Sequence, residues 1–307
     1  MDHINIFAPA SVANVSCGFD VLGFCLDTIG DIMKVSKTKT KGISVGTLKG
    51  QKIPIDPLKN VACVAANALL NDFPTNGGFQ IDIEKKIKPG SGIGSSGASS
   101  ASSVFAINEL LGNPYSKSEL IRFAMEGEKL SSGSIHADNV APAILGGVNL
   151  VKSISPIEVL QIPTPSDLCA VIIHPQIEIK TSDSRRLLPS KVLLSDATKQ
   201  LSSLGSLVHA LHLSDYQLIG SSLKDYLIEP HRSKLIPCFD KLKINALESG
   251  ALGCSISGSG PSVFALTKGL EIANKVEKSF SAIYETTNIS YETYVSKISS
   301  KGVSIIN

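Results

Sequence analysis

The chain has 307 residues, of which 43% are hydrophobic, and a formal net charge of +2, which predicts one large or two medium globular domains. The near balance of charges, without a basic tract, argues against nucleic acid or an anionic membrane surface as the main partner. No apolar stretch reaches the ~18 residues of a membrane-spanning helix and no basic-then-apolar leader opens the chain, so we expect a cytoplasmic protein. The six cysteines form no C-x-x-C pair, which predicts reduced thiols rather than disulfides or a structural metal site.

The first predicted elements are a short strand and a polar loop. Ile4, Ile6 and Ala8 recur at every second position, which is the period of a strand. In the loop that follows, Asn14 and Asp20 interrupt an apolar neighbourhood. Both residues can act as turn formers that bond their own backbone. Alternatively, Asp20 suits an ammonium group and Asn14 suits a carboxylate or hydroxyl group as ligand.

A loop rich in glycine and serine joins a predicted strand at 79–83 to a predicted helix that begins near residue 98. The strand alternates apolar and polar residues, and the helix has the apolar spacing of an amphipathic helix that ends at Gly112. Glycines can turn their N–H groups toward an anion, and the helix N-terminus adds its dipole. We predict a phosphate-binding loop, with an ordinary turn as the alternative. It consists of Pro89, Gly90, Ser91, Gly92, Ile93, Gly94, Ser95, Ser96 and Gly97.

Within this loop, the hydroxyl groups of Ser95 and Ser96 suit phosphate oxygens or the ligand shell of a magnesium ion. Two better-known phosphate motifs fit less well. The G-x-G-x-x-G spacing is present, but a dinucleotide-binding strand is buried on both faces, whereas this one alternates. A Walker loop requires a lysine at its end, and the next lysine is Lys117.

The next predicted helix begins with a capping box of Ser116 and Glu119, and an earlier Ala-rich helix begins after Asn60. The apolar face of the helix that begins at Ser116 carries Glu128. This residue is either a helix-end residue that turns to solvent or a magnesium ligand that faces the phosphates. His136 follows, and by residue type alone it is a structural, neutral histidine at a domain seam.

Proline density between two strand-like runs, 157–162 and 168–173, indicates a domain boundary near Pro163. We therefore expect domains at 1–163 and 164–307. In the second domain, Arg185 and Arg232 are solvated surface charges by type alone, although an arginine fork also suits a carboxylate. A second glycine-rich loop precedes an apolar strand at 263–266.

Several of these stretches resemble the GHMP kinases, a family of small-molecule kinases. Residues 92–97, GIGSSG, are similar to the G-L-G-S-S-A part of its P-x-x-x-G-L-G-S-S-A motif, with Ile93 in place of the usual leucine and Gly97 in place of the usual alanine; Pro89 corresponds to the motif's proline but precedes Gly92 by three positions instead of four. The segments APASVANVSCGFDVLG and HADNVAP are similar to motifs of the family's homoserine-phosphorylating branch. The second glycine-rich loop resembles the third GHMP motif.

The resemblance implies an α+β chain with the two-domain GHMP kinase fold. The N-terminal domain would contain a left-handed βαβ unit and the C-terminal domain would be ferredoxin-like, with the site between them. The implied reaction transfers the γ-phosphate of ATP to the hydroxyl of L-homoserine, a step toward threonine, with Mg²⁺ as the metal. By resemblance, the magnesium ligands are Ser96 and Glu128, the substrate-binding residues are Asn14, Asp20, His136, Asn139, Thr181, Arg185 and Arg232, and the loop packed over the phosphates is Gly258, Ser259 and Gly260.

The resemblance also places Asn139 at the active position where most relatives carry an aspartate. An amide cannot accept a proton near neutral pH, so positioning would carry the reaction. Asp138, its neighbour, is expected to point elsewhere, and it is the rival candidate for a base. Three other functions stay open: another GHMP kinase, a non-catalytic nucleotide-binding protein, and a dinucleotide oxidoreductase. A homodimer also stays open, and the adenine contacts are not marked in the sequence.

Overall fold

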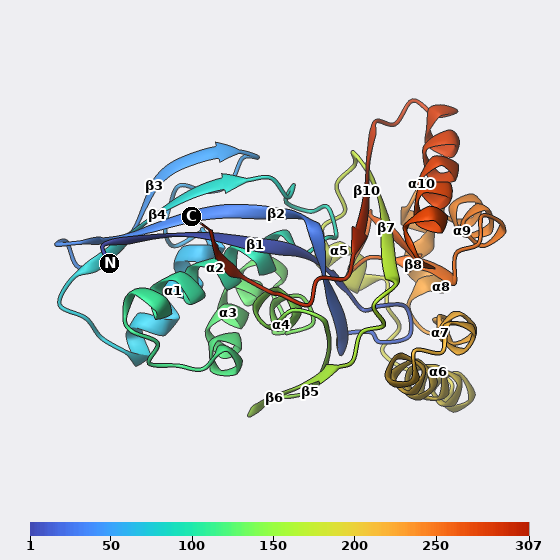
Figure 1. Cartoon of the computed structure of the whole chain (residues 1–307), viewed down its shortest axis with the longest axis horizontal. Coiled ribbons are helices and arrows are strands. Elements are labelled where there is room, and N and C mark those ends of the chain that lie inside the picture. The colour runs from blue at the N-terminus through green and yellow to red at the C-terminus, as the bar shows by residue number, and fades with distance from the viewer. Residues whose placement is uncertain (307) are drawn as a thin grey trace.

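A computed structural model describes residues 1–306. Seven strands form the first sheet: β1 (His3–Ala13), β2 (Leu22–Thr38), β3 (Gly42–Gly50), β4 (Gly78–Lys85), β5 (Val148–Ile154), β6 (Ile157–Ile162) and β11 (Ser304–Ile306). The main order is β11-β1-β2-β4-β3, while β5 pairs with β2 and β6 pairs with β5. The last strand thus returns the end of the chain to the first sheet, beside β1 (Figure 1).

One parallel pair stands in this otherwise antiparallel sheet. Strands β3 and β4 run parallel and are connected through helix α1 (Val61–Asp72), which makes a βαβ unit. Its left-handedness remains an expectation from the family fold. The alternation predicted for β4 is confirmed, because Phe79, Ile81 and Ile83 are buried while Asp82 and Glu84 are not.

Four helices cover one face of the first sheet (Figure 1): α1, α2 (Ser95–Leu110), α3 (Lys117–Ser132) and α4 (Val140–Leu145). The predicted caps are confirmed, since Asn60 accepts the N–H of Ala62 at 3.1 Å and Ser116 forms a capping box with Glu119. Helix α2 differs from the prediction of an amphipathic helix, because nearly all of its residues are buried. Strands β1 and β2 lie on one side of α2 and the other three helices lie around it. Helix α2 therefore has no solvent-exposed face.

The second sheet has the order β10-β7-β9-β8 and is antiparallel throughout. Its strands are β7 (Leu168–Pro175), β8 (Gly253–Ile256), β9 (Val263–Lys268) and β10 (Tyr291–Lys297). Between β7 and β8 lie α5 (Thr181–Arg186), α6 (Leu194–Leu213), α7 (Tyr216–Ser222), α8 (Glu229–Arg232), η1 (Ser233–Leu235) and α9 (Phe239–Glu248), and α10 (Leu270–Glu285) connects β9 to β10. This β-α-β-β-α-β order is the predicted ferredoxin-like arrangement.

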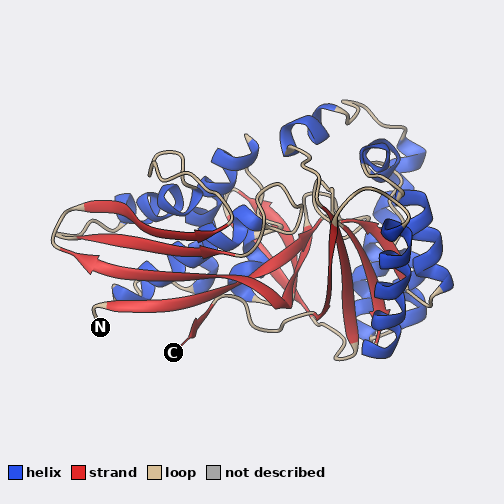
Figure 2. Cartoon of the chain, turned by 90° about the horizontal axis from the view of Figure 1, so that it is seen from above, coloured by secondary structure: helices blue, strands red, loops and turns tan. Residues whose placement is uncertain are grey.

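Strand β7 connects the cores of the two halves. Leu168, Ala170 and Ile172 belong to the core that includes the first sheet, while alternate residues such as Val171 and Ile173 belong to the core under α9 and α10. A strand buried on both faces reads as a continuous apolar run, as this one does. In Figure 2 the strands of both sheets run toward the middle of the molecule, where connecting loops gather.

The chain passes from the first sheet to the second between Ile162 and Leu168. The boundary at Pro163 lies in this link and remains a prediction. All six cysteines are free thiols. None of the helices in residues 1–306 has the length and apolar character needed to cross a membrane.

Candidate active site

A cavity of about 490 Å³ lies between the two halves and collects residues that are far apart in the sequence. Of the residues singled out in the sequence, Ser91, Ile93, Gly97 and Gly260 do not line this cavity. The lining includes Asn14, Asp20, Pro89, Gly90, Gly92, Gly94, Ser95, Ser96, Glu128, His136, Asp138, Asn139, Thr181, Arg185, Arg232, Gly258 and Ser259.

The phosphate-binding loop has a backbone that only glycine adopts easily. Gly90, Gly92 and Gly94 have φ values of 73°, 83° and 70°, in the left-handed region. A Cβ atom on Gly94 would stand 2.0 Å from Oγ of Ser11. Gly94 is also the N-cap of α2, and no side chain within residues 1–306 caps that helix end. The first N–H groups of a long helix therefore face the cavity without intrahelical partners, which suits an anion.

The second glycine-rich loop holds this loop in place from the other half. Ser257 donates a hydrogen bond to the carbonyl of Gly92 at 2.8 Å, and Ser262 donates one to the carbonyl of Ser91 at 2.6 Å. A Cβ atom on Gly92 would stand 2.6 Å from the carbonyl oxygen of Gly260. The two loops are thus in backbone contact, and larger side chains would separate them.

The hydroxyl of Ser95 does not face the cavity as a free donor, because it donates to the carbonyl of Ile87 at 2.9 Å. Beneath it lies a buried ion pair that was not predicted from the sequence. Lys85 donates to the carboxylate of Asp31, to the carbonyl of Ser95 at 2.6 Å and to the hydroxyl of Ser99 at 2.9 Å. Burial lowers the pKa of Lys85, and the charge of Asp31 opposes that effect.

The sequence did contain one signal for this pair. Lys85 follows the buried positions 79, 81 and 83 at the same period of two, so its side chain belongs to the buried face of β4. A charged residue at such a position requires a partner. Asp31 supplies it from the neighbouring strand β2, where it also accepts the N–H groups of Lys86 at 2.8 Å and Ile87 at 3.0 Å.

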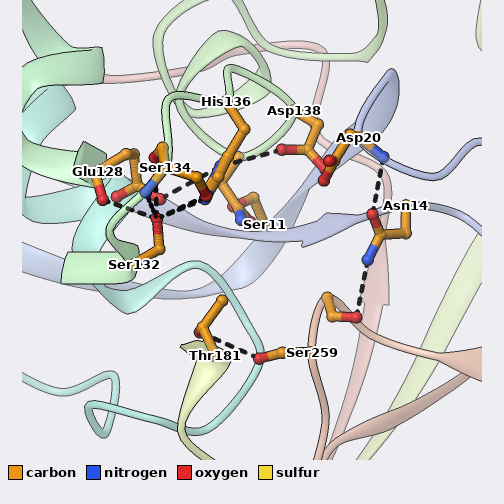
Figure 3. A network of polar contacts seen from close by, with 12 residues as sticks. Ser11, Asn14, Asp20, Glu128, Ser132, Ser134, His136, Asp138, Thr181 and Ser259 are labelled. Atoms are coloured by element: carbon orange, nitrogen blue, oxygen red, sulfur yellow. Dashed lines mark hydrogen bonds and ion pairs between the residues drawn. The ribbon is translucent and has the colours of Figure 1, made fainter. Parts of the chain in front are cut away.

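Three titratable side chains meet at the end of α3 (Figure 3). Nδ1 of His136 lies 3.3 Å from the carboxylate of Asp138 and 3.8 Å from that of Glu128, while Nε2 lies 3.0 Å from the hydroxyl of Ser132. Although burial acts to lower it, contact with Asp138 and the charge of Glu128 raise the pKa of His136 to about 9. The raised pKa favours the imidazolium form at neutral pH, in contrast to the neutral histidine expected from residue type alone.

Glu128 is only 2% exposed, so it does not turn to solvent from the helix end. Burial raises its pKa, although the charge of His136 acts in the opposite direction. Its Oε1 atom has no hydrogen-bond partner within residues 1–306. Asp138 is also 2% exposed and lines the cavity. The expectation that Asp138 points elsewhere is therefore wrong, because Asp138 lines the cavity and its carboxylate lies 3.3 Å from Nδ1 of His136.

Asn139 lies beside the start of α2. Its Oδ1 atom accepts a hydrogen bond from Ser11 at 2.8 Å, which leaves the amide N–H groups as donors. A Cβ atom on Gly97 would stand 3.1 Å from Cβ of Asn139, so the small residues of α2 allow this approach. Ser11 was not singled out by itself, although it lies in the segment APASVANVSCGFDVLG, and its partner lies 128 positions away.

The two predicted arginines lie in the cavity rather than in solvent. Arg185 makes a two-point ion pair with Asp20, with N–O distances of 2.9 and 2.7 Å. Arg232 is 2% exposed and donates to the carbonyl of Gly258 at 3.2 Å. Burial, together with the charge of Arg185, lowers the pKa of Arg232 to about 10. Two cations and one carboxylate therefore meet at this end of the cavity.

Asn14 bridges the two halves of the molecule beside these charges, and Thr181 contacts Ser259 within the second half (Figure 3). The amide of Asn14 donates to Gly258 at 2.7 Å, and its oxygen accepts the N–H of Asp20 at 2.9 Å. The hydroxyl of Thr181 lies 3.3 Å from that of Ser259. Asn14 and Asp20 have φ values of 70° and 59°, which L-residues rarely adopt outside tightly constrained or functional segments.

Comparisons with known proteins agree on one family. Residues 60–147 match the model of the GHMP kinases N terminal domain, and residues 207–286 match that of the GHMP kinases C terminal. The homoserine kinase of Chlorobium phaeovibrioides is 41% identical over 100% of both chains. That of Pyrococcus furiosus is 39% identical over 96% of this chain and 98% of its own.

Solved structures agree with these matches. The homoserine kinase of Cytophaga hutchinsonii has a TM-score of 0.96 and 45% identity, covering 100% of this chain and 98% of that one. The mevalonate kinase of L. major, solved in complex with R-mevalonate, has a TM-score of 0.70 at 15% identity, covering 95% of each chain. The second likeness concerns the fold alone.

Proposed function

The chain belongs to the homoserine kinases of the GHMP kinase family, and from that membership we propose that its cavity transfers the terminal phosphate of ATP to the side-chain hydroxyl of L-homoserine. The products are ADP and O-phospho-L-homoserine. One observation carries the proposal: an uncapped helix N-terminus behind a glycine loop shares a single cavity with Asp20, Arg185 and Arg232. The first feature suits phosphates, and the second suits a small zwitterion.

Ile53, Pro54, Val61 and Leu130 also line the cavity and would offer apolar surface to an adenine ring. The phosphates would lie along the loop, where backbone N–H groups and the dipole of α2 favour negative charge.

Magnesium fits the same region. The unpartnered Oε1 atom of buried Glu128 and the hydroxyl of Ser96 are oxygen ligands of the kind that Mg²⁺ prefers. Residues 1–306 contain no group of three or more His, Cys, Asp or Glu side chains that would hold a metal by themselves. That fits an ion held mostly by nucleotide phosphates and water, with few protein ligands. Bound there, the ion would neutralise charge on the phosphates.

The homoserine end offers one partner for each charge of the substrate. Asp20 suits the ammonium group, and the guanidinium groups of Arg185 and Arg232 suit the carboxylate. In the free protein Asp20 and Arg185 neutralise each other. A zwitterion that enters between them replaces one ion pair by two, so neither of these half-buried charges is left uncompensated. Asn14, His136 and Thr181 complete this end of the cavity.

The chemistry then depends on alignment. Asn139 lines the cavity, and because its Oδ1 atom accepts from Ser11, its amide N–H groups would orient the attacking hydroxyl. Asp138 is the rival candidate for a base, but its carboxylate is already paired with the imidazolium of His136. Phosphoryl transfer through a loose transition state requires mainly positioning and charge stabilisation, which the loop and α2 provide without a base.

ADP release in a coupled assay tests the function. Homoserine should support turnover, whereas mevalonate and shikimate, which lack the ammonium group, should not. Turnover with either of those in place of homoserine would indicate a different GHMP kinase, and ATP binding without ADP release would indicate a non-catalytic protein.

We also propose domains at 1–163 and 164–307, a cytoplasmic location and a homodimer. Light scattering in solution tests whether the protein is a homodimer.

A further inference from the structure

Phe19 lies between the two arginines of the substrate-binding end. Its ring centroid is 5.5 Å from Cζ of Arg185 and 5.2 Å from Cζ of Arg232. The half-buried ring belongs to the loop between β1 and β2, whereas the arginines belong to α5 and α8 in the other half of the molecule. Phe19 does not line the cavity itself. It therefore contacts the residues assigned to the substrate without being placed to contact the substrate.

The two cations differ in how they are compensated. Arg185 has the carboxylate of Asp20. Arg232 makes no ion pair within residues 1–306, donates only to the carbonyl of Gly258, and has a buried Nε atom without a partner. A buried guanidinium next to a second cation is unfavourable unless something offsets its charge. The face of an aromatic ring carries partial negative charge and attracts such a group.

We propose that Phe19 is a positioning residue that holds Arg185 and Arg232 in place for the substrate carboxylate through cation–π contacts, an inference that rests on the proposed function. The ring offsets part of the repulsion between the guanidinium groups before substrate arrives. It sits next to Asp20 in the chain, so one loop places a carboxylate against Arg185 and a π face against both arginines. An aliphatic side chain fills a similar volume but offers no such attraction.

The test compares Phe19→Leu, which removes the π face, with Phe19→Tyr, which keeps it. Steady-state ADP release gives kcat and the KM values for homoserine and ATP. We expect Phe19→Leu to raise the KM for homoserine about tenfold or more, as for the loss of a desolvated cation–π contact, with the KM for ATP unchanged. Phe19→Tyr should stay within about threefold of the unmodified protein. Phe73→Leu is a matched control, because Phe73 packs edge-on against Tyr115 away from the cavity.

Three outcomes overturn the proposal. In the first, the KM for homoserine in Phe19→Leu stays within about twofold of that of the unmodified protein. In the second, Phe19→Tyr raises the KM for homoserine as much as Phe19→Leu does, which indicates that side-chain shape matters rather than the π face. In the third, the KM values for homoserine and ATP rise together, which indicates general damage. Failure of the proposed function itself looks different. In that case the unmodified protein releases no ADP with homoserine, before any variant is compared.

Discussion

Replacing Lys85 by methionine should strongly destabilise the protein, because it breaks a buried ion pair beneath the phosphate-binding loop. Lys85 and Asp31 have side chains 2% and 0% exposed. Methionine keeps the apolar stem but leaves the Asp31 carboxylate with only two backbone N–H donors. It also removes the donor to the carbonyl of Ser95 and the hydroxyl of Ser99. Removing one partner of such a pair costs about 3–5 kcal/mol of unfolding free energy.

Urea unfolding measures this loss as a lower midpoint at an unchanged slope. The matched control is Lys86→Met in the next residue, whose ion pair with Glu84 is exposed, at 49% and 46%. That variant should lose less than about 1 kcal/mol. Adding Asp31→Asn to Lys85→Met should recover part of the loss, because the uncompensated charge is then gone. If Lys85→Met is no more destabilising than Lys86→Met, the buried pair does not have the role assigned to it.

Three further predictions concern the cavity. The Glu128→Gln variant should need at least about tenfold more magnesium for half-maximal activity, since the substitution removes a charged ligand. An unchanged magnesium dependence with an intact fold would contradict the assignment of Glu128 as a magnesium ligand. Asn139→Ala should lower kcat more than it raises KM. The Asp138→Asn variant should stay active with a pH–rate profile of unchanged shape. If the acidic limb of the pH–rate profile is lost in that variant, Asp138 is the base. The pKa of His136 is raised to about 9 in the folded protein, so protonation of this histidine stabilises the folded state. This contribution to the free energy of unfolding is complete below the unfolded-state pKa of about 6.5 and disappears as the pH rises toward 9. Unfolding free energies should therefore fall over that range in the unmodified protein more than in His136→Gln.

Much of the local structure follows from local patterns. The alternation in β4, the caps at Asn60 and Ser116, and the strand at 157–162 were all predicted, because each depends on residues within a few positions of one another. The glycine loop was predicted on the same basis, since its left-handed residues require glycine.

What the sequence did not indicate depends on distant partners. The period of β4 marks Lys85 as buried but does not mark its partner, because Asp31 lies 54 positions away. Asp20 and Arg185 lie 165 positions apart, so no local period connects them either. The all-round burial of α2 likewise depends on elements that surround it in space. Asp138 was expected to point away because it neighbours Asn139, but the turn before α4 brings both side chains into the cavity.

Identifying the phosphorylated product tests the central claim most directly. With ATP, magnesium and L-homoserine, mass spectrometry should detect O-phospho-L-homoserine in a one-to-one ratio to the ADP released, since the cavity aligns the hydroxyl with the terminal phosphate. Formation of ADP and free phosphate with homoserine left unmodified would contradict the account, because phosphate would then pass to water instead of the bound amino acid.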